Sequence, residues 1–294
     1  MLFAQILKEY MFGEVQKLVV DNFIICIMED FSKYNGEGTM LRKAQLRMLD
    51  ILVEIDRICR KHNIPYWIEY GTLLGAVRHG GFIPWDDDLD IAMMKEDYDR
   101  FLSIAPQELP DKFVVQNLDT EKYFPLSFTK IVDKHSVSYD NTMPFPHSKR
   151  KYKGLWVDIF PLIKGNVRFR RWLDPLYGKC FRRVHHFEPF CLNVFLAYLL
   201  YPVMWLLKQL IVLLCGFCND NMRMDEFDLN FRSSARQKFK SDYLPTKDIR
   251  FENIIVSAPN NWDKVLTVTY GDYMQIPPEE KRITHLFNEI SFSI

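Results

Sequence analysis

The feature that most constrains the fold is a group of four aspartates, Asp86, Asp87, Asp88 and Asp90, directly before the apolar residues 91–93. This apolar run predicts a buried strand over residues 88–93. On that strand Asp88 and Asp90 would point to the same side, because side chains alternate between the two faces. Two unit charges about 4 Å apart repel by about 4 kcal/mol at an effective dielectric constant of about 20. Such a pair needs protonation or a cation, and oxygen ligands favour Mg²⁺ or Mn²⁺. The alternative is a solvated acidic loop that caps a helix or pairs with Arg78 and Lys95.

A glycine and a hydroxyl residue, Gly71 and Thr72, precede the acidic group. They lie between a predicted aromatic strand over residues 66–70 and a short predicted helix that reaches Val77. Backbone N–H groups and the helix dipole at such a turn can hold a phosphate. Gly71 and Thr72 are therefore candidate phosphate contacts.

A lone aspartate, Asp158, interrupts the otherwise apolar residues 155–160, which predict another strand. A buried carboxylate is costly unless it is paired or binds a metal, so a satisfied core aspartate is the alternative. If this strand lies beside the strand of Asp90, then Asp88, Asp90 and Asp158 converge on one point. Asp158 could also accept the proton of an acceptor hydroxyl. Carboxylates with bound cations are typical of phosphoryl or nucleotidyl transfer.

Helices and strands alternate along the rest of the first half of the chain. Apolar residues recur at steps of three and four from Leu41 to Ile58, which predicts an amphipathic helix that Asn63 would end. The further candidates are a helix over 96–105 and strands over 113–116, 128–132 and 136–139. This alternation predicts an α/β fold with a mixed sheet.

Residues 187–218 are strongly apolar, with Lys208 as the only basic residue between Pro189 and Cys218. Pro202 and the pair Lys208-Gln209 interrupt the run, so a clean membrane span of about 20 residues is not expected. We expect two helices here, either packed in a helical subdomain or lying on a membrane surface.

The 38 basic and 38 acidic residues cancel, which argues against a nucleic-acid partner. The six cysteines have no disulfide-framework spacing, and no secretory signal is apparent. These features predict a cytoplasmic protein, with a peripheral position on the inner face of the membrane as the alternative.

The string GTLLGAVRHGGFIPWDDDLD at residues 71–90 resembles the signature of the LicD family, within the nucleotidyltransferase superfamily pattern. That family comprises phosphocholine transferases of bacterial surface polysaccharides, with fukutin-type sugar-phosphate transferases as distant relatives. The Asp158 strand and the tail from Tyr270 to His285 also resemble family segments. The resemblance covers roughly residues 41–285.

The resemblance implies a metal-dependent transfer of phosphocholine, or a similar phospho-alcohol, from a CDP-choline-like donor to a hydroxyl of a cell-surface glycan, lipopolysaccharide or lipid-linked sugar. It assigns the metal to Asp88, Asp90 and Asp158. Further expected donor contacts are phosphate contacts at Gly71, Thr72, Arg78, His79 and Lys130, and a cation–π contact of the quaternary ammonium with Trp85, or else with Trp156 or Tyr270.

Several roles stay open at this point. Arg78, His79 and Lys130 could be ordinary surface charges, and His79 could instead orient Asp86 or Asp87. Asp86 and Asp87 either shape the loop or bind metal. Lys281, Arg282 and His285 could reach the acceptor, but no pattern assigns them a role.

The expected organisation is an N-terminal helical extension (1–40), a nucleotidyltransferase-like catalytic core (41–165), an apolar helical insertion (166–225) and a C-terminal region that completes the site (226–294). Rival functions are transfer of another phospho-alcohol or a sugar phosphate, a non-catalytic binding module of the same fold, and nucleotide addition to RNA or protein. The neutral charge and the apolar segment favour the glycan function over nucleotide addition.

Overall fold

A computed structural model describes a large part of the chain in separate stretches. These are residues 30–121, 124, 126, 128–138, 150–164, 176–177, 179–181, 183–184, 191–216, 223–226, 238–282, 284 and 290–292. Most of the predicted extension 1–40, parts of the predicted insertion 166–225, and His285 therefore lie outside the described residues.

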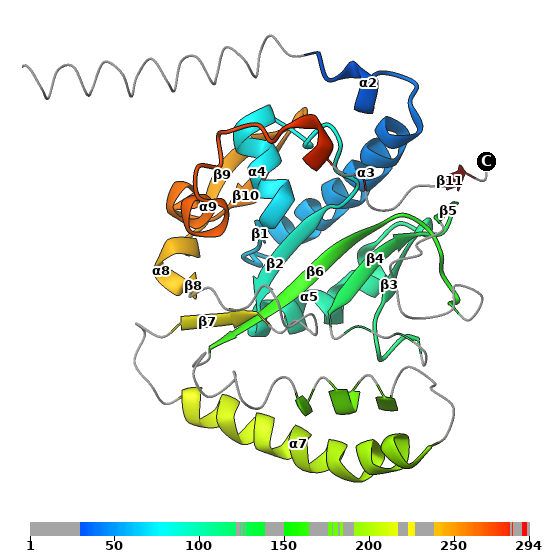
Figure 1. Ribbon diagram of the computed structural model, residues 1–294, viewed down its shortest axis with the longest axis vertical. Coiled ribbons are helices and arrows are strands. Elements are labelled where there is room, and N and C mark those ends of the chain that lie inside the picture. Colours follow the sequence, from blue (N-terminus) through cyan, green and yellow to red (C-terminus); the bar gives the residue numbers. More distant parts are fainter. Residues whose placement is uncertain are drawn as a thin grey trace, which may run out of the picture.

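A mixed sheet forms the centre of the molecule (Figure 1). Its strand order is β1 (Trp67–Ile68), β2 (Asp90–Met94), β6 (Trp156–Lys164), β4 (Thr129–Asp133) and β3 (Phe113–Gln116). β2 and β6 are parallel, whereas β1, β4 and β3 pair antiparallel to their neighbours. The far end of β6 also pairs with β7 (Arg223–Glu226), which pairs with β8 (Lys238–Phe239). The predicted α/β class with a mixed sheet is confirmed.

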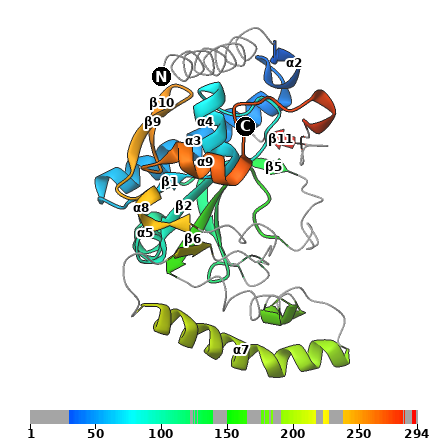
Figure 2. The ribbon, with the colours of Figure 1, turned by 60° about the vertical axis from the view of Figure 1, so that its left-hand side comes forward.

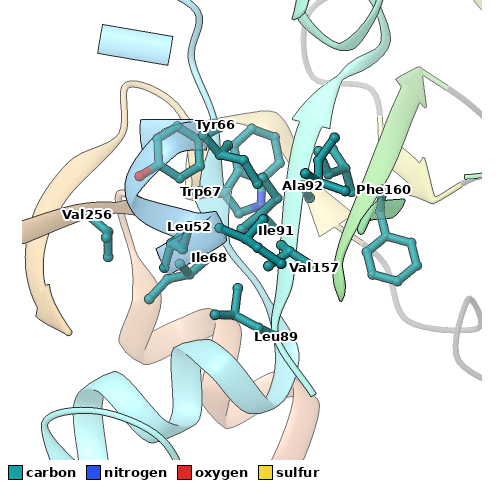
Figure 3. Packing of buried hydrophobic residues seen from close by; sticks show 14 of the residues in the cluster. Leu52, Tyr66, Trp67, Ile68, Leu89, Ile91, Ala92, Val157, Phe160 and Val256 are labelled. Atoms are coloured by element: carbon teal, nitrogen blue, oxygen red, sulfur yellow. The ribbon is translucent and has the colours of Figure 1, made fainter. Parts of the chain in front are cut away.

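The helices α3 (Met40–Lys61) and α5 (Lys95–Glu108) each contact more than one strand of the sheet. The Thr39 side chain caps α3 by accepting a hydrogen bond from the Arg42 backbone N–H. The apolar stripe of α3 is buried, as its periodicity predicts, and Asn63 follows the helix with φ 51°. Figure 3 shows this core, in which Leu52 of α3 lies near Ile68 and Ile91 of the sheet.

A second group of elements surrounds α4 (Tyr70–His79), the helix that follows β1. α4 contacts β2, β9 and α9, so the C-terminal region packs beside the loop that leads into β2. The remaining described elements are α2 (Ser32–Asn35), β5 (Ser136–Ser138), α7 (Leu192–Gly216), α8 (Lys240–Tyr243), β9 (Lys247–Phe251), β10 (Ile254–Ala258), α9 (Trp262–Tyr270), η2 (Glu279–Lys281) and β11 (Ile290–Phe292).

Two expectations about elements were wrong. The strand begins at Asp90, so Asp88 lies in the preceding loop and does not share a strand face with Asp90. The apolar segment forms one long helix, α7, rather than two. Pro202 removes a single backbone donor and leaves its ring at an exposed position, and Lys208 folds inward instead of ending the helix.

Candidate active site

Three charged residues form a row across three neighbouring strands. In the sheet register, Asp90 of β2 lies opposite Asp158 of β6, and Asp158 lies opposite Lys130 of β4. The Lys130 Nζ atom lies 2.8 Å from Asp158 Oδ1, and the Lys130 side chain is buried. The strand of Asp158 is thus the direct neighbour of the strand of Asp90. The sequence argument for converging acids required this arrangement.

The loop before β2 adds three more carboxylates to this end of the sheet. Oxygen atoms of Asp86, Asp87 and Asp88 can lie within 4.8 Å of one another, a spacing that a metal ion could bridge. Gln45 holds this loop from α3, because its Nε2 atom donates to the Asp86 carbonyl (2.8 Å) and to the Ile83 carbonyl (3.3 Å). The sequence did not single out Gln45, although an amide on the apolar stripe of a helix is a usable signal of such a role.

Burial raises the pKa of these acids, and mutual repulsion raises it further. The pKa of Asp86 rises to about 7, chiefly through burial and then through Asp87. Burial likewise lifts the pKa of Asp88 and of Asp90 well above the usual range, with Asp86 and Asp158 adding to both. Lys130 acts in the opposite direction on both. The acids therefore share one electrostatic environment, which a bound cation would stabilise in its ionised form.

Gly71 and Thr72 both position residues of the acid cluster, which we define as Asp86, Asp88, Asp90 and Asp158. The Thr72 hydroxyl accepts a hydrogen bond from the Asp90 backbone N–H (2.8 Å), and so fixes the start of β2. A Cβ atom on Gly71 would lie 2.6 Å from Asp86 Oδ2, so only glycine leaves that carboxylate its place. The sequence predicted that these two residues contact a phosphate. In the structure both lie directly beside the acids.

Arg78 and His79 lie at the C-terminal end of α4, about 12 Å along the helix from Gly71, and the His79 ring lies 6.0 Å from that of Trp85. Arg78 also lowers the pKa of Asp86. Arg78 is buried, and its guanidinium donates to the Tyr273 carbonyl (3.0 Å) and the Gln275 carbonyl (3.2 Å). Arg78 Nε also donates to His79 Nε2 (3.0 Å). Arg78 thereby ties α4 to the segment after α9.

His79 is neutral at physiological pH. Burial, and then Arg78 and Arg282, lower its pKa to about 3. Because Nε2 accepts the bond from Arg78, the ring proton resides on Nδ1. Its ring lies at a T-shaped angle to the rings of Phe31 and Trp85, so aromatic rings and the two arginines surround it.

The aromatic residues proposed to hold a quaternary ammonium are placed differently from one another. Trp85 is buried against Phe31 and Tyr34, and the Arg282 guanidinium lies 5.1 Å from its ring centroid. The Trp156 ring already has the Lys130 ammonium 3.9 Å from its centroid. Both rings thus have a cation of the chain itself as a neighbour. Tyr270, at the end of α9, is 43% exposed.

The charged pair Glu69 and Lys238 lies beside the acid cluster and was not predicted from the sequence. Glu69 is buried; it accepts from Trp67 Nε1 (2.7 Å) and from Lys238 Nζ (3.2 Å). The Glu69 backbone N–H donates to the Asp90 carbonyl, so this pair also steadies the start of β2. The next residue, Tyr70, has φ 47°, which is uncommon for a residue with a side chain. The glutamate inside the aromatic strand was the available signal.

Comparison with known proteins shows what the chain is similar to. The model of the LicD/FKTN/FKRP nucleotidyltransferase domain matches residues 63–198, which include the acid cluster, Gly71, Thr72 and Lys130. The lipopolysaccharide cholinephosphotransferase LicD of Haemophilus influenzae is 27% identical over 276 residues, which cover 85% of this chain and 97% of that protein. The ribitol 5-phosphate transferase FKRP of Homo sapiens is 56% identical over 116 residues, which cover 39% of this chain and 23% of that protein. The domain match and the near full-length similarity to LicD agree: the chain is similar to proteins of the LicD family.

Proposed function

We propose that this protein is a phosphotransferase that moves phosphocholine from a CDP-linked donor to a hydroxyl of a cell-surface glycan or lipopolysaccharide. The observation that carries the proposal is the register of Asp90, Asp158 and Lys130 on neighbouring strands. The Haemophilus influenzae relative, which is named a cholinephosphotransferase, aligns over nearly its whole length and supports the same transfer.

The acid cluster fits a divalent cation, Mg²⁺ or Mn²⁺. Its ligand atoms would be carboxylate oxygens, which these hard ions prefer. Burial and then repulsion between the acids raise the pKa of Asp88 and Asp90, so a cation would offset the cost of ionising them. We assign the ion to Asp88, Asp90 and Asp158, with Asp86 as an additional candidate. Such an ion would offset the negative charge on the phosphates during transfer.

The other residues of the site would position the acids and the donor. Lys130 orients Asp158 through its ion pair and leaves a positive charge close to the region of the donor phosphates. Thr72 fixes the Asp90 backbone, and Gly71 leaves space for Asp86. Arg78 holds the C-terminal segment against α4 and also donates to His79, so we expect both residues to shape the site rather than touch the phosphates.

A second candidate is transfer of ribitol phosphate. The supporting observation is the similarity to FKRP, which is named a ribitol 5-phosphate transferase, although the match spans less than a quarter of that protein. The same acid cluster would serve both reactions, so the two differ only in how the alcohol is held.

The direct test is release of cytidine monophosphate from a panel of donors. The protein would be incubated with CDP-choline, CDP-ethanolamine and CDP-ribitol, each with Mg²⁺, Mn²⁺ or a chelator, together with lipopolysaccharide as acceptor. The proposal expects metal-dependent release that is fastest with CDP-choline and is lost in Asp90→Asn. Fastest release with CDP-ribitol would select the second candidate. Donor binding without release under any condition would favour a non-catalytic binding module.

A further inference from the structure

The helix α7 exposes apolar side chains over most of its circumference. Figures 1 and 2 both show α7 along the lower side of the molecule, below the sheet. Leu192 is 71% exposed and Leu206 is 60% exposed. The other exposed large apolar residues of the helix are Phe195, Leu196, Tyr198, Leu199, Leu200, Val203, Trp205, Leu207, Leu210, Leu213 and Leu214. An exposed apolar surface of this kind marks an interaction site.

A narrow stripe attaches α7 lengthwise to the protein. Val194, Ala197, Met204 and Lys208 are buried, and their spacing puts them on one side of the helix. Met204 packs with Tyr177 and Phe181, and the helix also contacts β6.

Lys208 is the only charged residue of α7, and it belongs to the buried stripe. Its Nζ atom lies 4.1 Å from the ring centroid of Tyr177. The outward-facing arc, as far as the structure describes its side chains, therefore carries no charge at all.

We propose that α7 docks the protein on a lipid bilayer, lying in the interface with its outward arc among the acyl chains. A partner helix or a second copy would cover one stripe and leave a polar rim, whereas the described exposed side chains of this helix are apolar except for Asn193 and Gln209. Tyr198 and Trp205, both exposed on the arc, are residue types that prefer the membrane interface.

The charge of the preceding segment agrees with an anionic lipid surface. Residues 164–190 contain seven lysines and arginines against two aspartates and glutamates, although the whole chain is neutral. Basic residues next to an apolar surface helix strengthen its attraction to anionic lipids.

A lying orientation follows from the attachment. Residues 192–210 are apolar enough to cross a membrane by length and composition, with a mean hydropathy of 1.2. The buried stripe, however, runs along the helix from Val194 to Lys208, so a crossing helix would draw its protein partners Tyr177 and Phe181 into the hydrocarbon. Bilayer docking would bring the proposed phosphotransferase to lipid-linked acceptors.

The test is flotation of the full chain with vesicles, with neither donor nor metal present, so that the result does not depend on the proposed reaction. Vesicles would contain phosphatidylcholine alone or equal parts of phosphatidylcholine and phosphatidylglycerol. We expect the protein to float with both and more strongly with the anionic mixture. The double variant Leu199→Glu/Leu206→Glu should bind at least about tenfold more weakly, because two side chains lose their apolar burial. The matched control is Ile255→Glu/Val268→Glu, at residues about half exposed on β10 and α9, which should float like the wild type.

Three results would overturn the proposal. One is a wild-type protein that does not float with the vesicles. If light scattering then shows a wild-type dimer and a monomeric double variant, the arc is an interface between copies of the chain. Another is a folded double variant, by circular dichroism, that floats as well as the wild type. The third is retention of the wild type on vesicles after an alkaline carbonate wash, which releases surface-bound proteins and would indicate a spanning helix.

Discussion

Asp90 and Asp158 face each other across the only parallel pairing that the described part of the sheet contains, between β2 and β6. Parallel strands bring equivalent ends together, so two acids from distant parts of the sequence meet at the same edge. Lys130 continues the row on β4, and the loop residues Asp86 and Asp88 lie at the start of β2. Backbone pairing and a short loop thus bring these carboxylates to one edge of the sheet, where Lys130 pairs with Asp158 and lowers the pKa of Asp88 and Asp90.

Replacing Asp90 by its amide should separate function from stability. Asp90→Asn keeps the side-chain shape but removes a charge that the cluster repels, so the melting temperature should stay equal or rise. Transfer should fall at least about a hundredfold, since a ligand of the catalytic ion is lost. Asp99→Asn, at an exposed position of α5, is the matched control and should leave both unchanged. An active Asp90→Asn protein would contradict the assignment.

Replacing Lys130 should destabilise the protein. Lys130→Met keeps the aliphatic length but leaves Asp158 buried among other acids, and loss of one partner of a buried ion pair costs about 3 kcal/mol. Urea unfolding would measure the free-energy change. Lys112→Met, at a partly exposed residue with only a 4.0 Å ion pair to Asp50, should change it by less than about 1 kcal/mol. Equal changes in unfolding free energy for the two variants would mean that the Lys130–Asp158 ion pair contributes no more to stability than an exposed pair.

Thr72 offers a test of the hydroxyl alone. Thr72→Val is nearly isosteric but leaves the Asp90 N–H without its acceptor, which should cost about 1–3 kcal/mol in unfolding free energy and also reduce transfer. Thr72→Ser keeps the hydroxyl and should retain most of both. A Thr72→Val protein that matches Thr72→Ser in stability and rate would show that this bond does not position Asp90.

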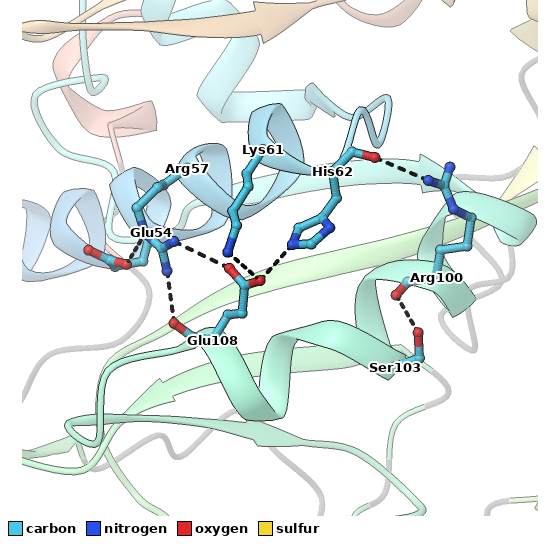
Figure 4. A network of polar contacts seen from close by, with 7 residues as sticks. All are labelled: Glu54, Arg57, Lys61, His62, Arg100, Ser103 and Glu108. Carbon is cyan, nitrogen blue, oxygen red and sulfur yellow. Dashed lines mark hydrogen bonds and ion pairs between the residues drawn. The ribbon is translucent and has the colours of Figure 1, made fainter.

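Glu108 should make stability depend on pH in the acid range. Hydrogen bonds from Lys61 and then His62 lower its pKa to about 2, and Arg57 joins the same network at the end of α5 (Figure 4). Because the folded pKa lies below the unfolded value of about 4.3, its contribution is complete above pH 4.3 and disappears as pH falls through about 2.

The comparison of wild type with Glu108→Gln by thermal melting at several pH values measures this effect. The wild type should melt higher at pH 6, and the difference should shrink steadily from about pH 4.3 downward. Glu280→Gln, at an exposed position of η2, should show no such trend. A difference that stays constant down to pH 2.5 would rule out the shift.

Much of the fold followed from periodicity, and the reasons are local. The stripe of α3 and the apolar strands β3 and β6 are long or regular enough to be recognised without tertiary contacts. Asp158 was identified because a carboxylate in an apolar strand is costly, and its placement beside Asp90 was the condition on which the sequence argument depended.

The remaining features depend on contacts that a sequence pattern does not encode. Asp88 lies outside the strand because β2 begins only where Asp90 pairs with Asp158. Arg78 donates hydrogen bonds to the carbonyls of residues 273 and 275, which lie nearly two hundred positions away in the sequence. Its charge alone suggested a surface or phosphate contact, because the sequence does not show these partners. Lys208 reads as an interruption in the sequence, but the ring of Tyr177 accommodates it. In each case a distant partner decides the role.

The measurement that tests the central claim most directly is an isothermal titration calorimetry experiment in which Mn²⁺ is added to the protein. The wild type should bind the ion with an affinity at least about tenfold above that of Asp90→Asn/Asp158→Asn, since the double variant lacks two of the three assigned ligands. Equal affinity in the two proteins would contradict the account, because the ion would then not be held between β2 and β6.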